Sequence, residues 1–226
     1  MKFNTFAKSA SIAFLLAASG VYAAIDKLPE VTVDGLHHLS DTELAIVYAE
    51  PGIDLGQYEK IFLAEAHVAF KKNWQRDQNR GNRLKVRTED MERIQEDVAT
   101  LFREVFTEEL LDGGYELAEE IGDDVLLVKP AIVDLDVTAP DIQRAGRTNS
   151  YSESAGEMTL NLELFDSLTG DKIAKATDRK RDYRRGYAEW RTSVSNRSDA
   201  RRMMTSWAKA LRSALDEARS ATPATK

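Results

Sequence analysis

Cysteine is absent from this chain of 226 residues. Its absence excludes disulfide bonds, thiolate nucleophiles and thiolate-ligated zinc sites, and it also excludes a lipid carried by a cysteine. A domain of about 200 residues does not need such cross-links, because it can bury roughly 70% of the surface that its unfolded chain exposes. We therefore expect a fold held together by its hydrophobic core.

Histidine is scarce, and several common catalytic and cofactor motifs are missing. His37 and His38 are adjacent, His67 stands alone, and no H-E-x-x-H spacing occurs. The pair could bind zinc or copper only with Asp41 or Glu43, so we interpret both histidines as exposed polar residues. The sequence has no G-x-S-x-G elbow, no Walker loop and no G-x-G-x-x-G loop. We predict no metal, no cofactor and no assigned catalytic residue.

Long apolar runs are also missing, apart from one short segment near the amino terminus. Lys2 and Lys8 flank the start of this region, the apolar run covers residues 11–18, and a small-x-small sequence ends at Ala23. This order is typical of a secretory signal peptide, so we predict one over residues 1–23 with cleavage after Ala23. The run is far shorter than the ~20 residues of a membrane-spanning helix. We expect an exported, soluble protein, located in a bacterial periplasm or secreted beyond the cell.

The rest of the chain indicates one domain with irregular flanks. Residues 24–56 mix turn residues with short apolar pairs, and only residues 44–48 look like a strand, so we expect an amino-terminal arm. Residues 57–219 are predicted to form a single α+β domain. Residues 220–226 are predicted to be a frayed tail.

Hydrophobic periodicity predicts the elements of that domain. Strands are predicted over residues 60–70, 125–137, 157–165 and 172–177, the last two joined as a hairpin by turn residues 166–171. In the first strand the predicted inward face is Phe62, Ala64, Ala66, Val68 and Phe70. Apolar residues three and four apart predict one helix that begins at Thr88 and stops at Gly113-Gly114, and another that begins at Ser198.

The predicted order of elements is β-α-β-β-β-α. This order favours an α+β fold with an antiparallel-rich sheet of about four to five strands and two main helices packed on one face. No internal repeat is visible in the sequence.

Several segments resemble a known family when they are taken together. They are Asp34-Gly35-Leu36, YAEPGIDLGQY at 48–58, LELFDSLTGDKIA at 162–174, Asp178-Arg179, Trp207-Ala208 and Leu211-Arg212. In combination they resemble the bacterial envelope family of unknown function numbered 3313. The resemblance implies no settled activity and no catalytic residues. Many members of that family look like lipoproteins, whereas this chain has no cysteine to carry a lipid.

Two segments concentrate positive charge and aromatic rings in a chain whose formal net charge is −7. One is KKNWQRDQNRGNRLKVR at 71–87, and the other is DRKRDYRRGYAEWR at 178–191. Each follows a predicted strand, so the two segments would form one positive patch if the strand ends lie at the same edge. The predicted contacts to an anionic partner are Lys71, Lys72, Trp74, Arg76, Arg181, Arg184, Arg185 and Tyr187.

A structural interpretation of the second segment competes with this one. Tyr183, Tyr187 and Trp190 are four and three residues apart, and on a helix they would form one stripe that packs against the sheet. The arginines would then extend into water.

Guanidinium groups bind phosphate and carboxylate in a bidentate manner, and aromatic rings stack on sugars or lie at lipid interfaces. Export argues against nucleic acid as the partner. We therefore predict a non-catalytic envelope protein that binds an anionic envelope component or a partner protein, with its oligomeric state left open. The alternative is a hydrolase or transferase that acts on envelope polysaccharide, for which Asp134 and Asp136 are the best pair of acids and Asp123-Asp124 another.

Overall fold

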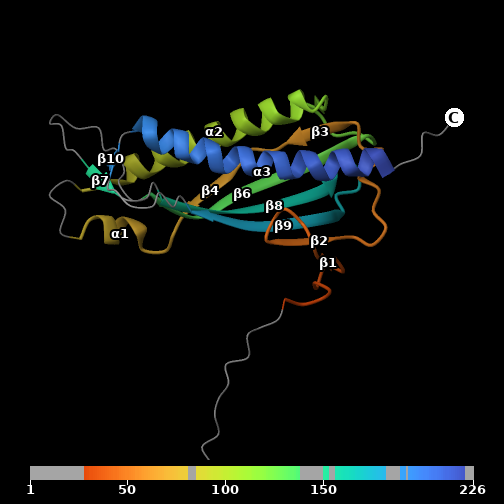
Figure 1. Ribbon diagram of the computed structural model, residues 1–226, viewed down its shortest axis with the longest axis horizontal. Helices are drawn as coiled ribbons and strands as arrows, with labels where there is room; N and C mark the ends of the chain where they lie inside the picture. Colours follow the sequence, from red (N-terminus) through yellow and green to blue (C-terminus); the bar gives the residue numbers. More distant parts are fainter. Residues whose placement is uncertain are drawn as a thin grey trace, which may run out of the picture.

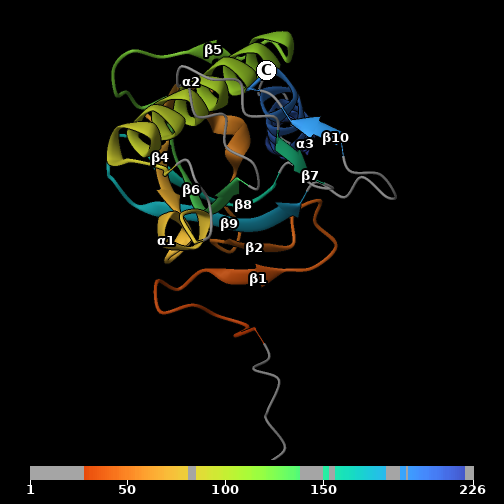
Figure 2. The ribbon, with the colours of Figure 1, turned by 90° about the vertical axis from the view of Figure 1, so that its left-hand side faces the viewer.

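The computed structural model of the protein describes residues 28–80, 85–137, 150–152, 156–181, 189–191 and 193–221. Its two long helices, α2 (Thr88–Asp112) and α3 (Ser193–Ala221), lie side by side along one side of a large sheet (Figures 1 and 2). The predicted signal peptide with its cleavage site at Ala23 lies outside the described residues. Within those residues, none of the helices combines the length and the apolar character needed to cross a membrane.

The main sheet has eight strands in the order β1-β2-β9-β8-β6-β3-β5, and β4 also pairs with β6. Their bounds are β1 (His37–Leu39), β2 (Ile46–Ala49), β3 (Lys60–Leu63), β4 (His67–Phe70), β5 (Glu116–Leu117), β6 (Val125–Val137), β8 (Gly156–Asp166) and β9 (Lys172–Arg181). Strands β3, β4 and β5 join by parallel pairing, and the other neighbours are antiparallel.

Four smaller elements complete the described fold. Strands β7 (Ser150–Ser152) and β10 (Glu189–Arg191) form a separate antiparallel pair. The short helix α1 (Trp74–Gln78) follows β4, and a 3₁₀ turn covers Leu55–Gln57.

The predicted fold class is wrong in the sheet and in the order of elements. The sheet is mixed and has eight strands, rather than an antiparallel-rich sheet of four to five, and α1 is a third helix. The strands that sequence analysis did not predict as separate elements have only two to four residues, which is too short to show a two-residue period.

The predicted strand over residues 60–70 is in fact two strands, β3 and β4. Both pair with β6 in parallel, and the gap between them lies opposite Pro130, which has no backbone N–H to donate. The interruption also shifts the inward face. Ile61 and Leu63 are buried before the gap and Ala66 and Val68 after it, whereas Phe62 is only half-buried.

The predictions for α2 and β8 are confirmed. Helix α2 runs from Thr88 to Asp112, with the backbone N–H of Arg87 donating to Asp90 Oδ2 at 2.9 Å and with Gly113-Gly114 at its end. Its buried apolar side chains are Leu101, Phe102, Val105, Phe106 and Leu110, and those of β8 are Met158, Leu160, Leu162 and Leu164. Together with residues of α3, these side chains form one core between the sheet and the two helices.

Helix α3 begins at Ser193, five residues before the predicted cap at Ser198. Met204, Trp207, Leu211 and Leu215 are buried at the predicted spacing. The indole Nε1 of Trp207 donates to Asp178 Oδ2 at 2.7 Å, and Asp178 Oδ1 accepts from the backbone N–H of Ala45 at 3.1 Å. The carboxylate of Asp178 therefore connects α3, β9 and the segment before β2.

Candidate functional site

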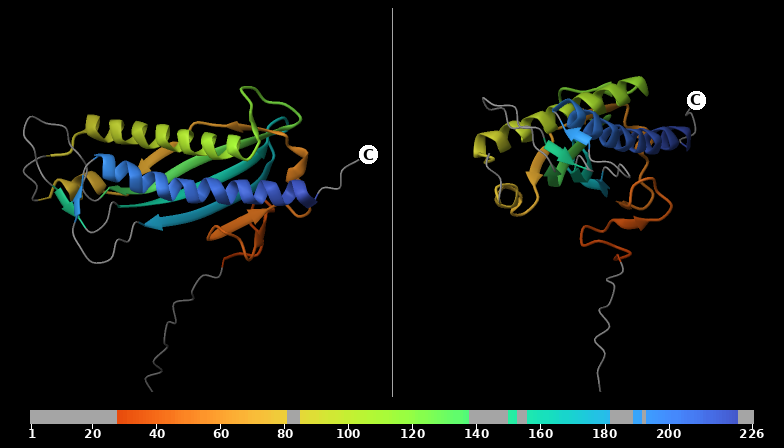
Figure 3. Two further views of the ribbon diagram at one scale, coloured as in Figure 1. Left: turned by 45° about the horizontal axis from the view of Figure 1, so that its top comes forward. Right: turned by 60° about the vertical axis from the view of Figure 1, so that its left-hand side comes forward.

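The strand registers bring the starts of the two basic segments to the same end of the sheet. Phe70 of β4 pairs with Leu135 of β6, Asp136 of β6 pairs with Glu157 of β8, and Glu157 pairs with Arg181 of β9. With neighbouring strands about 4.8 Å apart, the ends of β4 and β9 are separated by only about 14 Å. We call this end of the sheet, with residues 71–80 and 179–181, the basic end; α1 and β7 lie there in Figure 3.

A buried carboxylate lies at the centre of the basic end. Glu157 has a side chain that is only 9% exposed, and it binds cations from both sides. Lys71 Nζ lies 3.1 Å from Glu157 Oε1, and Arg179 Nη2 lies 2.6 Å from Glu157 Oε2. Lys71 Nζ also lies 3.1 Å from Asp136 Oδ2. These contacts join the segment after β4 to β6, β8 and β9.

The electrostatics of this cluster follow from its geometry. The hydrogen bond from Arg179, followed by the contact with Lys71, holds the pKa of Glu157 below its ordinary value despite the opposing effect of burial. Hydrogen bonds to Asp136 and Glu157 raise the pKa of Lys71. The positive charges of Lys71 and Arg179 are thus compensated within the protein.

Trp74 is an anchor of α1 and not an exposed ring. Its side chain is 4% exposed and stacks on Phe70 with the ring centroids 4.2 Å apart. Its Nε1 donates to the carbonyl oxygen of Val137 at 3.2 Å. Asn73, with a left-handed φ of 65°, turns the chain from β4 into this helix. The tryptophan therefore holds the first basic segment against the end of β6.

The other predicted contacts differ in their surroundings. Lys72 is exposed, and Arg76 is exposed and lies 3.1 Å from Asp77 Oδ1. Arg181 is exposed at the end of β9. Arg184, Arg185 and Tyr187 lie outside the described residues, as does Tyr183. The structure thus brings Lys71, Lys72, Arg76 and Arg181 to one end, and it turns Trp74 inward.

Sequence analysis missed Glu157, Asp136 and Arg179 as parts of this cluster. Glu157 begins an otherwise clean apolar alternation, and Asp136 follows a bulge between Val133 and Asp136, where Asp134 has a φ of 50°. The sequence does show a charged residue, Glu157, at the start of a core strand and on the face predicted to point outward. It does not show which residues pair with Glu157, because Lys71 and Arg179 belong to other segments of the chain.

Of the acids considered for catalysis, Asp124 and Asp136 are held in ion pairs, whereas Asp123 and Asp134 are exposed. Asp124 Oδ2 lies 2.9 Å from Lys60 Nζ, whose hydrogen bond lowers the pKa of Asp124. Asp136 contacts Lys71, whereas Asp134 is exposed. The described residues contain no group of three or more histidine and acidic side chains that could hold a metal ion. His37, His38 and His67 are all exposed.

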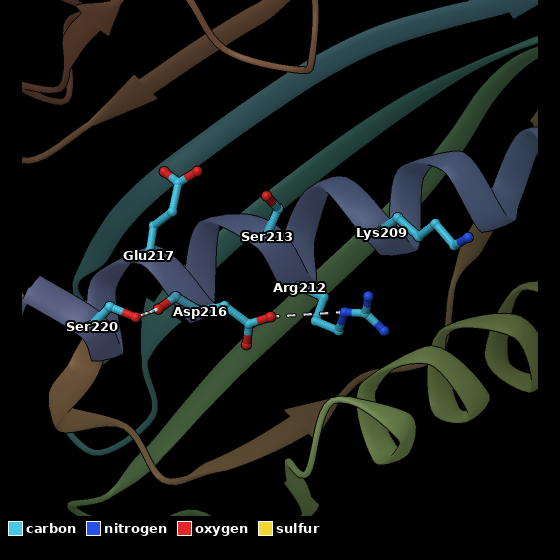
Figure 4. Close-up of a pocket in the computed structure, with 6 residues that line it drawn as sticks. All are labelled: Lys209, Arg212, Ser213, Asp216, Glu217 and Ser220. Atoms are coloured by element: carbon cyan, nitrogen blue, oxygen red, sulfur yellow. Dashed lines mark hydrogen bonds and ion pairs between the residues drawn. The ribbon is translucent and has the colours of Figure 1, made fainter.

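An open hollow lies along α3, away from the basic end (Figure 4). Its lining residues are Lys209, Arg212, Ser213, Asp216, Glu217 and Ser220. All come from one helix, and their charges compensate one another: Arg212 Nε lies 3.8 Å from Asp216 Oδ2, and Arg212 Nη1 lies 2.5 Å from Glu109 Oε1. Ser206 and Lys209 match an S-x-x-K pattern by spacing, but both are exposed on this helix. The hollow therefore offers no assembled site.

Comparisons with known proteins identify the family of this chain and several solved structures that are distantly similar to it. The family model described as "Protein of unknown function (DUF3313)" matches residues 33–211. No curated protein matches the chain. Among solved structures, a PelC dodecamer from Paraburkholderia phytofirmans is similar at 9% identity and a TM-score of 0.35, covering 74% of this chain and 96% of that one.

Two further solved structures are similar at the same low level. A Xanthomonas campestris protein of family DUF330 has 13% identity and a TM-score of 0.37, with 73% of this chain and 89% of that chain covered. A minor lipoprotein from Acinetobacter baumannii has 14% identity and a TM-score of 0.29, with 72% and 95% covered.

Proposed function

We propose that this protein, which belongs to the DUF3313 family of proteins of unknown function, binds an anionic partner in the cell envelope through its basic end. The observation that carries the proposal is the row of paired residues that runs from Phe70 to Arg181 across four strands. Because of this row, the two segments that are richest in Lys and Arg start from one end of the sheet. The partner is an envelope component that presents phosphate or carboxylate groups, or an acidic protein.

The contacts divide the basic residues into two groups with different roles. Lys71 and Arg179 hold the strand ends together through Glu157, so their positive charges are already compensated within the protein. Binding an external anion is therefore the role of cations farther along the chain, namely Lys72 and the pair Arg184 and Arg185. Trp74 fixes the base of this surface, and Tyr187 would supply an aromatic contact.

Co-sedimentation of the exported chain with lipid vesicles, comparing neutral with anionic headgroups, tests the proposal. The variant R184E/R185E should bind anionic vesicles more than about tenfold less tightly than wild type does, since each basic residue near such a surface contributes about 1 kcal/mol to binding. Wild-type binding should also weaken as salt is added. Purified cell-wall sacculi provide the carboxylate-bearing alternative in the same assay.

The matched control is R103E/K209E, which reverses the same number of charges on the exposed faces of α2 and α3. This variant should bind as the wild type does. Equal binding by both double variants, to vesicles and to sacculi alike, would mean that the basic end is an ordinary solvated surface.

A further inference from the structure

The end of the sheet opposite the basic end carries two exposed aliphatic side chains. Ile121, in the segment between β5 and β6, and Leu168, in the turn between β8 and β9, are each 63% exposed. Single exposed aliphatic residues are common on protein surfaces. These two differ because they lie in turns that are hydrogen-bonded to each other.

Both turns are held firmly in place. The backbone N–H of Gly122 donates to Ser167 Oγ at 3.1 Å, and the Ser167 hydroxyl donates to the carbonyl oxygen of Gly122 at 2.8 Å. Asp166 Oδ1 accepts from the backbone N–H groups of Leu168 at 2.9 Å and Thr169 at 2.8 Å. The Tyr58 hydroxyl donates to Asp166 Oδ2 at 3.1 Å. The backbones that carry Ile121 and Leu168 are therefore ordered before any partner binds, which lowers the entropic cost of binding.

Exposed carboxylates lie close to both of these side chains in the sequence. Those nearby in the sequence are Glu116, Glu119, Glu120, Asp123 and Asp171, all exposed. We call Ile121, Leu168 and these carboxylates the acidic end. Nearby lysines are already paired, Lys60 with Asp124 and Lys172 with Glu163. These exposed carboxylates thus lie at the end of the sheet opposite the exposed cations Lys72, Arg76 and Arg181.

We propose that the acidic end of one copy docks onto the basic end of a second copy, so that the chains associate head to tail. This inference rests on the proposed function, because it names a second copy as an acidic partner of the same basic end. Opposite charges would orient the two copies, and Ile121 with Leu168 would supply the apolar anchors at the centre of the contact. Such an interface is heterologous, so it extends into a ring or an open chain of copies and does not stop at a dimer.

Sedimentation velocity of the exported chain at low and high salt is the test. Wild type should form species larger than a dimer at low salt and should dissociate as salt is added. The variant I121S/L168S, with its acidic end weakened, and K72E/R76E, with two exposed charges of the basic end reversed, should each remain monomeric. The control V33S/L39S, which changes two exposed aliphatic residues of the amino-terminal segment, should associate as wild type does.

Mixing the two defective variants separates a head-to-tail contact from other modes of association. Each variant keeps one intact end, so an equimolar mixture should form dimers and nothing larger. A mixture that stays monomeric, a wild type that is monomeric at low salt, or association that survives in either variant would overturn the inference. If wild type is monomeric but R184E/R185E still loses vesicle binding, the proposed function stands and only the self-association fails.

Discussion

The two ends of β8 both depend on a glycine with a positive φ, but the surroundings of the two glycines differ. Gly156 starts the strand with a φ of 139°, and a Cβ placed there would lie 1.9 Å from the carbonyl oxygen of Asp136. Gly170, in the turn after the strand, has a φ of 77°, and no atom lies within 4 Å of the position that its Cβ would take. The first glycine is required by close packing and by conformation, the second by conformation alone.

The two ends of the sheet also differ in the contacts that hold them together. At the acidic end, residues close together in the sequence shape the turn, since the Gly170 N–H donates to the Asp166 carbonyl at 3.0 Å and the Asp166 side chain caps the same turn. At the basic end, the contacts join residues on different strands, with Glu157 linking Lys71 and Arg179. Local hydrogen bonds thus shape the turn after β8 at the acidic end, whereas the ion-pair cluster at the basic end consists only of contacts between different segments of the chain.

The largest expected effect is the contrast between alanine substitutions at these two glycines. Gly156→Ala should lower the free energy of unfolding by about 3 kcal/mol, because backbone strain is added to a clash that pushes β8 away from β6. Gly170→Ala should cost only about 1 kcal/mol, from conformational strain without a clash. Urea denaturation of both variants measures the difference, and equal losses would contradict the close approach of β8 to Asp136.

A smaller effect is expected from removing the charge of Glu157. Glu157→Gln should lower the free energy of unfolding by about 1 kcal/mol at pH 7, a modest value because solvent still reaches Lys71 and Arg179. Since the folded-state pKa of Glu157 is lowered, its stabilising effect is present above the ordinary value of 4.5 and is lost as pH falls through the folded-state pKa.

The gap in stability between wild type and Glu157→Gln should therefore close as the pH is lowered below about 4. Denaturation curves at several pH values, with the exposed Glu120→Gln as the control, provide the measurement. A gap that stays constant down to pH 3 would show that the charge of Glu157 contributes nothing.

The smallest expected effect concerns the exposed pair of Arg76 and Asp77. Its side chains are 72% and 57% exposed, so Arg76→Ala should change the free energy of unfolding by less than about 0.5 kcal/mol. Thermal unfolding followed by circular dichroism would check this value. A loss as large as that of Glu157→Gln would indicate that Arg76 belongs to the cluster at the basic end.

The elements that could be predicted from the sequence are those whose pattern lies within a single segment of the chain. The apolar spacing of α2, the alternation of β8 and the turn residues at 166–171 are local properties, and the structure has each element where it was predicted. The candidate site could be predicted from the sequence only in part. The sequence identifies two basic segments that follow strands, but it does not distinguish an exposed Trp74 from a buried one.

By itself, the sequence determined the main helices, the core strand β8 and the unequal distribution of charge along the chain, because these depend on the order and spacing of neighbouring residues. Only the tertiary structure decided that the sheet is mixed, that residues 60–70 divide opposite Pro130, and that Glu157 joins Lys71 to Arg179. The physical reason is that strand order and register depend on pairings between residues far apart in the sequence, such as Ile46 and Thr177, and these pairings leave no periodic pattern in any single segment.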